Sequence, residues 1–323
     1  MALLDRLPPQ PVIPLMGYPG IQLTGSSLWQ NETNPALQAR TIAALAAEFN
    51  PDAVFPFMDL TIEAGAIGLP VHFPLHESPT VTSHPVRHTA DIDPLRVPDI
   101  RHDVRVEGVA RVIRTLKAQN IGLVGGYVTG PFTLAGLMMG AGDVALATRT
   151  NPDLLHAALD FATTTIQQYA AVLVDAGADM IAILEPTASF ISAKAFDVFS
   201  GPYVVQIIAA LDVPAILHIC GKTTHLIPAM AATGADALSL DTQVDLAAAA
   251  RQVPQTVGLI GNIDPVGVMA HGDVAEVQAA VHKLKGAMQP YVNFVISTGC
   301  DLPPETPLAN IAAFMDSARA SGG

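Results

Sequence analysis

One histidine and two cysteines stand where predicted strands end. His218 and Cys220 lie in LHICG (217–221), and Cys300 closes the apolar run 293–300; the chain has no other cysteine. Side chains alternate faces along a strand, so His218 and Cys220 point the same way. If a barrel forms, the strand bearing Cys300 lies across its mouth, close enough for all three to bind one ion. Zinc takes thiolate and imidazole ligands, and three protein ligands with one open position are typical of a catalytic site.

The alternative interpretation is a small buried cysteine beside a hydrogen-bonded core histidine. An H-x-C pattern alone does not separate the two, but both cysteines at strand ends favour the metal. The short paired spacings of closed structural zinc sites are absent. A zinc ion held by two thiolates and one imidazole is only mildly acidic. Its natural task is to bind a thiol and lower its pKa, which indicates alkyl transfer to sulfur.

Eight short apolar runs, separated by Ala-rich segments of helical spacing, predict the elements that position these residues. Near-continuous apolar strands alternating with helices favour a parallel sheet, and eight of them favour a closed (β/α)₈ TIM barrel. A doubly wound open sheet is the second choice, because no GxGxxG follows the first strand. The predicted strands lie in 11–20, 52–60, 121–132, 178–186, 213–221, 235–241, 256–264 and 293–300.

We expect one barrel domain over residues 1–323, with an N-terminal extension and a long loop excursion after the second strand, from 60 to 120. Half of the residues are hydrophobic, which is enough for a large core. Active sites of such barrels lie where the strands end.

Charge and composition exclude several classes of partner. The net charge is −13 and no basic stripe occurs, so we expect no nucleic acid. Residues 121–142 carry no charge but hold seven glycines and a proline, which predicts strand, loop and buried helix rather than a membrane span. The first ten residues lack the order of a signal peptide, so we expect a cytoplasmic protein.

Several segments resemble the uroporphyrinogen decarboxylase superfamily, and within it the zinc methyltransferases that move a methyl group from a corrinoid protein to coenzyme M. GCDLPPETPLANI (299–311) is similar to their zinc-cysteine segment, and their H-x-C…C motif is filled by His218, Cys220 and Cys300. The resemblance implies a (β/α)₈ barrel, Zn²⁺, a corrinoid methyl donor and coenzyme M as the acceptor thiol. No D-x-H-x-x-G corrinoid signature occurs, so the corrinoid would arrive on a separate, transiently bound protein or free. The other matching segments are 124–138, 182–192, 217–223, 235–241 and 258–265.

Two alternative functions remain. Decarboxylases of the superfamily hold their substrate with arginines in the first strand and loop, yet residues 15–30 contain no Arg or Lys. A decarboxylase of uroporphyrinogen or a related cyclic acid would have to use Arg87, Arg101 or Arg105. The third possibility is a non-catalytic subunit that docks a corrinoid protein.

Two acids at strand ends are candidate catalytic residues. Glu185 could be a fourth zinc ligand or accept the proton of the thiol; the alternative is a carboxylate bonded to backbone N–H groups. Asp241 could orient His218, as outer ligands of metal sites do, or cap the next helix.

Four further residues are candidate substrate-binding positions. Tyr127 and Thr129, in GGYVTGPF, are expected to line the cavity. Asn262 could shape the pocket, although a turn before Pro265 would explain it as well. Asp59 could line the mouth after the second strand; the alternative is an acid in the first turn of a helix.

Overall fold

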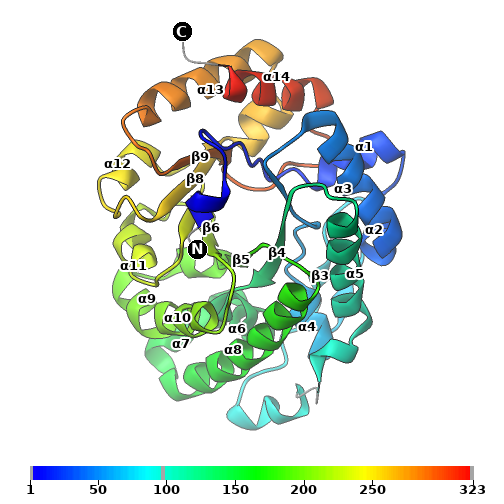
Figure 1. Ribbon diagram of the computed structural model, residues 1–323. Coiled ribbons are helices and arrows are strands. Elements are labelled where there is room, and N and C mark those ends of the chain that lie inside the picture. The colour runs from blue at the N-terminus through cyan, green and yellow to red at the C-terminus, as the bar shows by residue number, and fades with distance from the viewer. Residues whose placement is uncertain (1–2, 96–98, 321–323) are drawn as a thin grey trace.

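Seven parallel strands form one curved sheet in a computed structural model that describes residues 3–95 and 99–320 (Figure 1). The sheet order is β1-β4-β5-β6-β7-β8-β9. Each strand falls inside a predicted apolar run, so the α/β barrel class is confirmed. The strands are β1 (Ala53–Val54), β4 (Leu123–Thr129), β5 (Met180–Leu184), β6 (Ala215–Ile219), β7 (Ala237–Leu240), β8 (Gly258–Ile263) and β9 (Phe294–Thr298).

The prediction of a regular strand within residues 11–20 is wrong. Only an isolated parallel bridge forms, between Val12 and Ile296 of β9. On its other side the Val12 carbonyl accepts from the Asp52 amide at 3.0 Å, just before β1. The segment therefore spans the gap between β9 and β1. Prolines at 11, 14 and 19 lack an N–H and cannot donate to a longer ladder.

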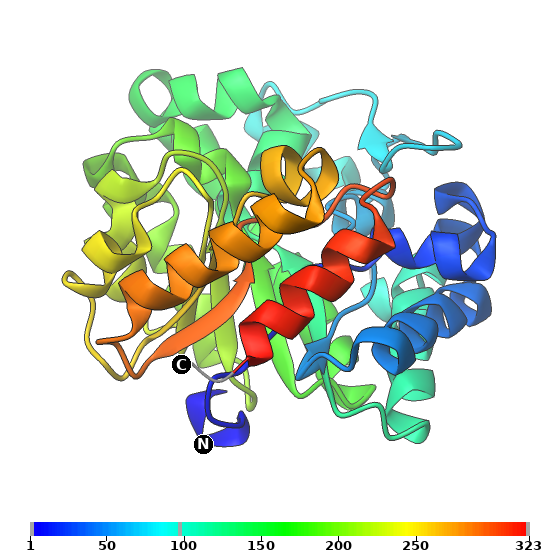
Figure 2. The same ribbon diagram turned by 90° about the horizontal axis from the view of Figure 1, so that it is seen from above.

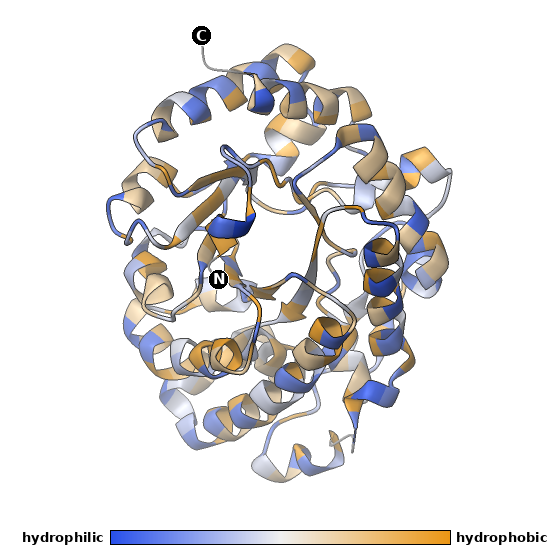
Figure 3. Ribbon diagram, in the orientation of Figure 1, coloured by the Kyte–Doolittle hydropathy of each residue, from blue (hydrophilic) through white to orange (hydrophobic). Residues whose placement is uncertain are grey.

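Helices surround the sheet, and in Figure 3 hydrophobic and hydrophilic residues alternate along them. Polar caps set several starts: the Asp103 carboxylate accepts from the Arg105 and Val106 amides, and Asp273 forms a capping box with Glu276. The longer helices are α3 (Pro35–Phe49), α5 (Val104–Ala118), α7 (Ala141–Thr150), α8 (Pro152–Asp175), α13 (Val274–Met288) and α14 (Leu308–Arg319). The shorter ones are α1 (Ile21–Thr24), α2 (Leu28–Thr33), α4 (Ile62–Ala66), α6 (Pro131–Met139), α9 (Ala193–Phe199), α10 (Gly201–Ala209), α11 (Ile227–Ala231) and α12 (Leu246–Ala250).

The barrel interior is closed at the amino ends of the strands. The N-terminal 3₁₀ turn η1 (Leu3–Arg6) lies across that end (Figures 1 and 2). Leu3 is fully buried there and packs with Met180 and Val295, near the starts of β5 and β9. Only the carboxyl ends of the strands are left as a mouth for chemistry, as expected for this fold.

The predicted excursion lies between β1 and β4. It contains α4, a small antiparallel pair β2 (Val71–His72) with β3 (Thr80–Val81), and α5; residues 96–98 are outside the described part. Within the described residues no single helix is long and apolar enough to cross a membrane. Helices α6 and α7 pass that test only as a pair bent by 103°.

Candidate metal centre

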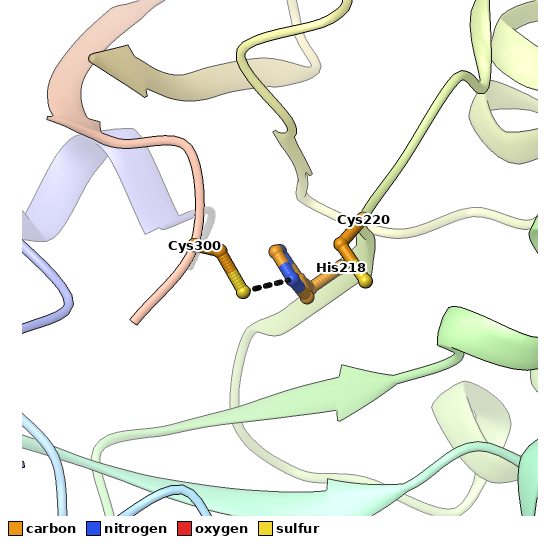
Figure 4. Close-up of side chains that lie close together, drawn as sticks. All are labelled: His218, Cys220 and Cys300. Atoms are coloured by element: carbon orange, nitrogen blue, oxygen red, sulfur yellow. Dashed lines mark hydrogen bonds between the residues drawn. The ribbon is translucent and has the colours of Figure 1, made fainter. Parts of the chain in front are cut away.

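His218, Cys220 and Cys300 converge at the mouth of the barrel (Figure 4). One ligand atom from each lies within 4.8 Å of the others. The Cys300 sulfur lies 3.8 Å from Nε2 of His218. His218 is in β6, Cys220 follows that strand directly, and Cys300 follows β9. The predicted meeting of the two strand ends is therefore confirmed.

Two glycines allow these chain segments to approach. Gly221 has φ +85°, a left-handed conformation that lets the chain turn away directly after Cys220. Beside Cys300, a Cβ on Gly299 would lie 2.6 Å from the Thr242 amide nitrogen. The loop after β9 can thus cross the loop after β7 only because residue 299 lacks a side chain, and this crossing carries Cys300 toward His218.

Ser239 orients the histidine. Its hydroxyl lies 2.9 Å from Nδ1 of His218, and the two residues are register partners on β6 and β7. This contact leaves Nε2 free to face Cys300. Asp241, two residues further on, was the sequence candidate for orienting His218 or for capping the next helix, and Ser239 was not among the candidates. The signal was present, because Ser239 shares a strand face with Asp241 and precedes it by two residues.

The two thiols interact. A hydrogen bond with Cys300, which outweighs the opposing effect of burial, lowers the pKa of Cys220 to about 5. The same hydrogen bond and burial raise the pKa of Cys300 well above its usual range. Cys220 is therefore the first of the pair to become a thiolate, the form in which cysteine binds metal.

The three side chains fit zinc. Zinc–sulfur bonds of about 2.3 Å and zinc–nitrogen bonds of about 2.0 Å place tetrahedral ligand atoms about 3.5–3.8 Å apart. The 3.8 Å between the Cys300 sulfur and Nε2 of His218 is close to the separation of about 3.5 Å that such bonds give a sulfur–nitrogen pair. Two soft thiolates and one imidazole with an oriented ring also form a donor set typical of zinc.

Asp241 and Asn262 support the loops beside these ligands. The Asp241 carboxylate accepts from the Gly221 amide at 2.8 Å and from the Gln243 amide at 2.9 Å. It holds the turn after Cys220 and makes no hydrogen bond to His218. The Asn262 side-chain amide donates to the carbonyls of Asp241 (2.9 Å) and Val244 (2.7 Å). Its amide hydrogens are thereby used to hold the loop after β7 rather than to form a turn before Pro265.

Glu185 is fully buried and does not belong to the ligand group. Its carboxylate accepts from the Phe132 amide (2.7 Å), the Thr133 amide (3.1 Å) and the Ser200 hydroxyl (2.9 Å). This is the second of the two interpretations, a strand-end acid bonded to backbone N–H groups. Burial raises its pKa to about 7, against the effect of these hydrogen bonds.

Thr129 and Asp59 are likewise bound within the protein. The Thr129 amide and hydroxyl donate to the Glu63 carboxylate at 2.6 and 2.8 Å. The Asp59 carboxylate accepts from the amide and hydroxyl of Thr61 and pairs with Arg105. Neither side chain directs a free polar atom toward the metal ligands.

Tyr127 is the predicted substrate-binding residue that lies beside the centre. Its ring stacks on Phe55, with centroids 4.7 Å apart, and both rings line a small apolar cavity beneath His218. A Cβ on Gly125 would overlap the Phe55 ring, so that glycine allows the close approach expected of it. Burial is the main cause that raises the Tyr127 pKa, and the negative charges of Asp301 and Cys300 add to it.

Fold and site together define a barrel enzyme with a group of one histidine and two cysteines, placed as ligands of a metal ion could be, at the carboxyl ends of its strands. The family profile described as uroporphyrinogen decarboxylase (URO-D) matches residues 8–321. The chain belongs to this family, which confirms the resemblance seen in its motifs.

Known relatives separate into two kinds. The methylcobamide:CoM methyltransferase MtbA of Methanosarcina mazei is 32% identical over 82% of this chain and 78% of its own length. MtbA of Methanosarcina acetivorans is also 32% identical, with the same coverage. The uroporphyrinogen decarboxylase of Prochlorococcus marinus (strain MIT 9312) is 27% identical over 90% of this chain and 86% of its own length. A solved structure, "methyltransferase from Methanosarcina mazei", superposes with a TM-score of 0.86 at 25% identity, covering 97% of this chain and 94% of the other.

Proposed function

We propose that this enzyme is a zinc-dependent methyltransferase that moves a methyl group from a methylated corrinoid to a small thiol. The observation that carries the proposal is the convergence of His218, Cys220 and Cys300 within 4.8 Å. The names of the MtbA relatives support corrinoid as donor and make coenzyme M one candidate acceptor. The corrinoid would arrive free or on a transiently bound protein.

His218, Cys220 and Cys300 would hold the zinc ion. A zinc ion bound there, with one coordination position left for the substrate, would lower the pKa of a coordinated thiol, so that the thiol would be a thiolate at neutral pH. In the transfer a sulfur–carbon bond forms as the cobalt–carbon bond breaks, and the electron pair of the broken bond stays on cobalt as Co(I).

The residues of the chain prepare the site for this transfer. Ser239 keeps the His218 ring turned with Nε2 toward Cys300. Asp241 holds the turn that follows Cys220. The apolar interior beneath His218, lined by Tyr127 and Phe55 among others, keeps water from approaching through the barrel.

The decarboxylase alternative needs free cations at the mouth. In the structure each candidate arginine is paired with an acid: Arg87 with Asp143, Arg101 with Asp99, and Arg105 with Asp59. These pairs leave the carboxylates of a cyclic polyacid without the anchors that the sequence suggested, which favours thiol methylation.

The test combines metal analysis with a thiol screen. Purified protein is incubated with methylcobalamin and candidate thiols, and formation of cob(I)alamin is followed by absorbance. We expect about one zinc per chain and turnover, both lost in Cys220→Ser and in Cys300→Ser. His225→Gln is the control, because His225 lies on the same loop but bonds to the Ile191 carbonyl. Freshly prepared folded protein without metal, or cysteine variants with full activity, would contradict the proposal.

A further inference from the structure

Cys220 and Cys300 are the only cysteines of the chain, and both are free at the mouth of the barrel. Their sulfurs lie within 4.8 Å of each other and of a ring nitrogen of His218 (Figure 4). No third cysteine competes for either of them. Any disulfide that forms within one chain therefore joins these two sulfurs.

A short movement separates the two thiols from a disulfide. The sulfurs of a disulfide are about 2.0 Å apart, so from the 4.8 Å limit they approach by at most about 2.8 Å. Neither cysteine lies within a strand or a helix, because Cys220 follows β6 and Cys300 follows β9. Rotation about the Cα–Cβ bonds moves the sulfurs without disturbing the hydrogen bonds of the sheet.

Small reagents reach both sulfurs from the mouth. Cys220 and Cys300 are partly exposed, whereas His218 between them is buried. Cysteines that are oxidised reversibly are typically accessible to solvent and have a second cysteine beside them. This pair has both features.

Hydrogen peroxide, as the oxidant, converts the pair in two steps. One cysteine sulfur attacks the O–O bond, takes up one oxygen as a sulfenic acid, and a water molecule leaves. The other sulfur then attacks the sulfenic sulfur, so that the S–S bond forms, the S–O bond breaks and a second water leaves. The two sulfurs together lose two electrons and both thiol protons, and the peroxide is reduced to two water molecules.

The disulfide and a zinc ion exclude each other at this site. Zinc binds cysteine as the thiolate, and the disulfide consumes both thiolates at once. Only His218 would then remain, which is fewer than the three protein ligands of a catalytic zinc site. A bound zinc ion, in turn, would keep the two sulfurs about 3.8 Å apart, well beyond the length of an S–S bond.

We infer that Cys220 and Cys300 form a reversible disulfide that switches the metal site off under oxidising conditions. Reduction regenerates both thiols, and the site binds zinc again. This regulation rests on the proposed zinc-dependent transfer, whereas the disulfide itself rests only on the placement of the two cysteines.

Thiol counting and mass spectrometry on metal-free protein test the disulfide. The full chain is stripped of metal with a chelator and a reductant, freed of both, and treated with a small excess of hydrogen peroxide. We expect loss of both thiols, an intact mass lower by two hydrogens, and a linked pair of peptides containing Cys220 and Cys300. Dithiothreitol should restore both thiols. A mass raised by oxygen atoms, or a covalent dimer, would overturn the inference.

Zinc-loaded protein tests the exclusion of metal by the disulfide. During stepwise addition of peroxide, a metal-binding dye should report release of about one zinc ion for each pair of thiols lost. Rebinding of zinc should follow reduction with dithiothreitol. Zinc that stays bound after both thiols are lost would overturn the switch.

Three variants serve as controls, each checked for folding by circular dichroism. His218→Ala removes a metal ligand but keeps both cysteines, so it should form the disulfide even in the presence of zinc. Cys220→Ser and Cys300→Ser should form no disulfide within the chain. Protection of the His218→Ala thiols by zinc, equal to that of wild type, would show that the metal is not held where the switch requires it.

The outcomes separate this inference from the proposed function. A disulfide in protein that transfers no methyl group to any thiol would contradict the proposed function and leave the disulfide standing. An active zinc enzyme whose cysteines are oxidised to sulfinic acids, with no S–S bond, would overturn the inference and leave the proposed function standing.

Discussion

The hydroxyl of Ser239 lies 2.9 Å from Nδ1 of His218, on the side of the ring opposite Cys300. One hydroxyl on a neighbouring strand thus determines which ring nitrogen faces the two thiols. In metal sites such outer partners fix the ring and its tautomer, and their loss weakens metal binding.

Ser239→Ala should therefore reduce zinc affinity about tenfold to a hundredfold while the fold is kept. The measurement is a chelator competition at fixed pH. Ser297→Ala is a matched control, because Ser297 is a buried serine on β9 whose hydroxyl has no hydrogen-bond partner among the described residues. Equal affinities in wild type and Ser239→Ala would show that the ring is oriented by packing alone.

Asp241→Ala should lower both the free energy of unfolding and the zinc affinity. The substitution leaves the Gly221 and Gln243 amides without their charged acceptor, a loss of about 1–3 kcal/mol. Denaturant unfolding and zinc titration measure the two effects. Asp245→Ala, which removes only a cap of α12, is expected to cost about 1 kcal/mol and leave zinc binding unchanged. If Asp241→Ala lowered the free energy of unfolding but left the zinc affinity unchanged, Asp241 would have only a capping role.

Glu185→Gln distinguishes a structural from a catalytic role for this acid. Because both carboxylate oxygens accept hydrogen bonds, the amide would turn an N–H₂ group toward a donor. The free energy of unfolding should fall by about 1–3 kcal/mol, with zinc content and thiol turnover per folded molecule unchanged. Loss of zinc from a folded Glu185→Gln protein would instead make Glu185 a ligand.

Glu63 should make the enzyme less stable as pH rises toward neutrality. Burial raises its pKa from 4.5 to about 7, despite hydrogen bonds from Thr129. Between these values the folded state binds more protons than the unfolded state, so the free energy of unfolding falls as pH increases and levels off above about 7. The full contribution is about 3 kcal/mol.

Glu63→Gln carries no titratable group and should lose this part of the pH dependence. Denaturant unfolding of both proteins at pH 5, 6, 7 and 8 makes the comparison, and other buried acids cancel because both proteins contain them. If the free energy of unfolding changed with pH in the same way for both proteins, Glu63 would be ionised in the folded protein from pH 5 to 8, and the prediction would be wrong.

Local patterns were sufficient for the strands of the parallel sheet and for the convergence of His218, Cys220 and Cys300. Apolar runs ended by polar residues located all seven strands of the parallel sheet but not the small pair β2 and β3, and the two-residue repeat of a strand placed His218 and Cys220 on one face. The scarcity of cysteine made Cys300 the natural third ligand. The eighth predicted strand, at 11–20, does not form because its three prolines have no backbone N–H to donate to a neighbouring strand.

The partners of the polar side chains were decided only by the tertiary structure. Ser239 rather than Asp241 reaches His218 because the register between β6 and β7 sets them side by side. Glu185, Thr129 and Asn262 have sequence positions typical of a site, yet they bond to backbone or to Glu63. The amino-acid sequence determines which face of a strand a side chain occupies, because that depends on neighbouring residues. Which group it meets depends on the register and on crossing loops, and these form only when the barrel is assembled.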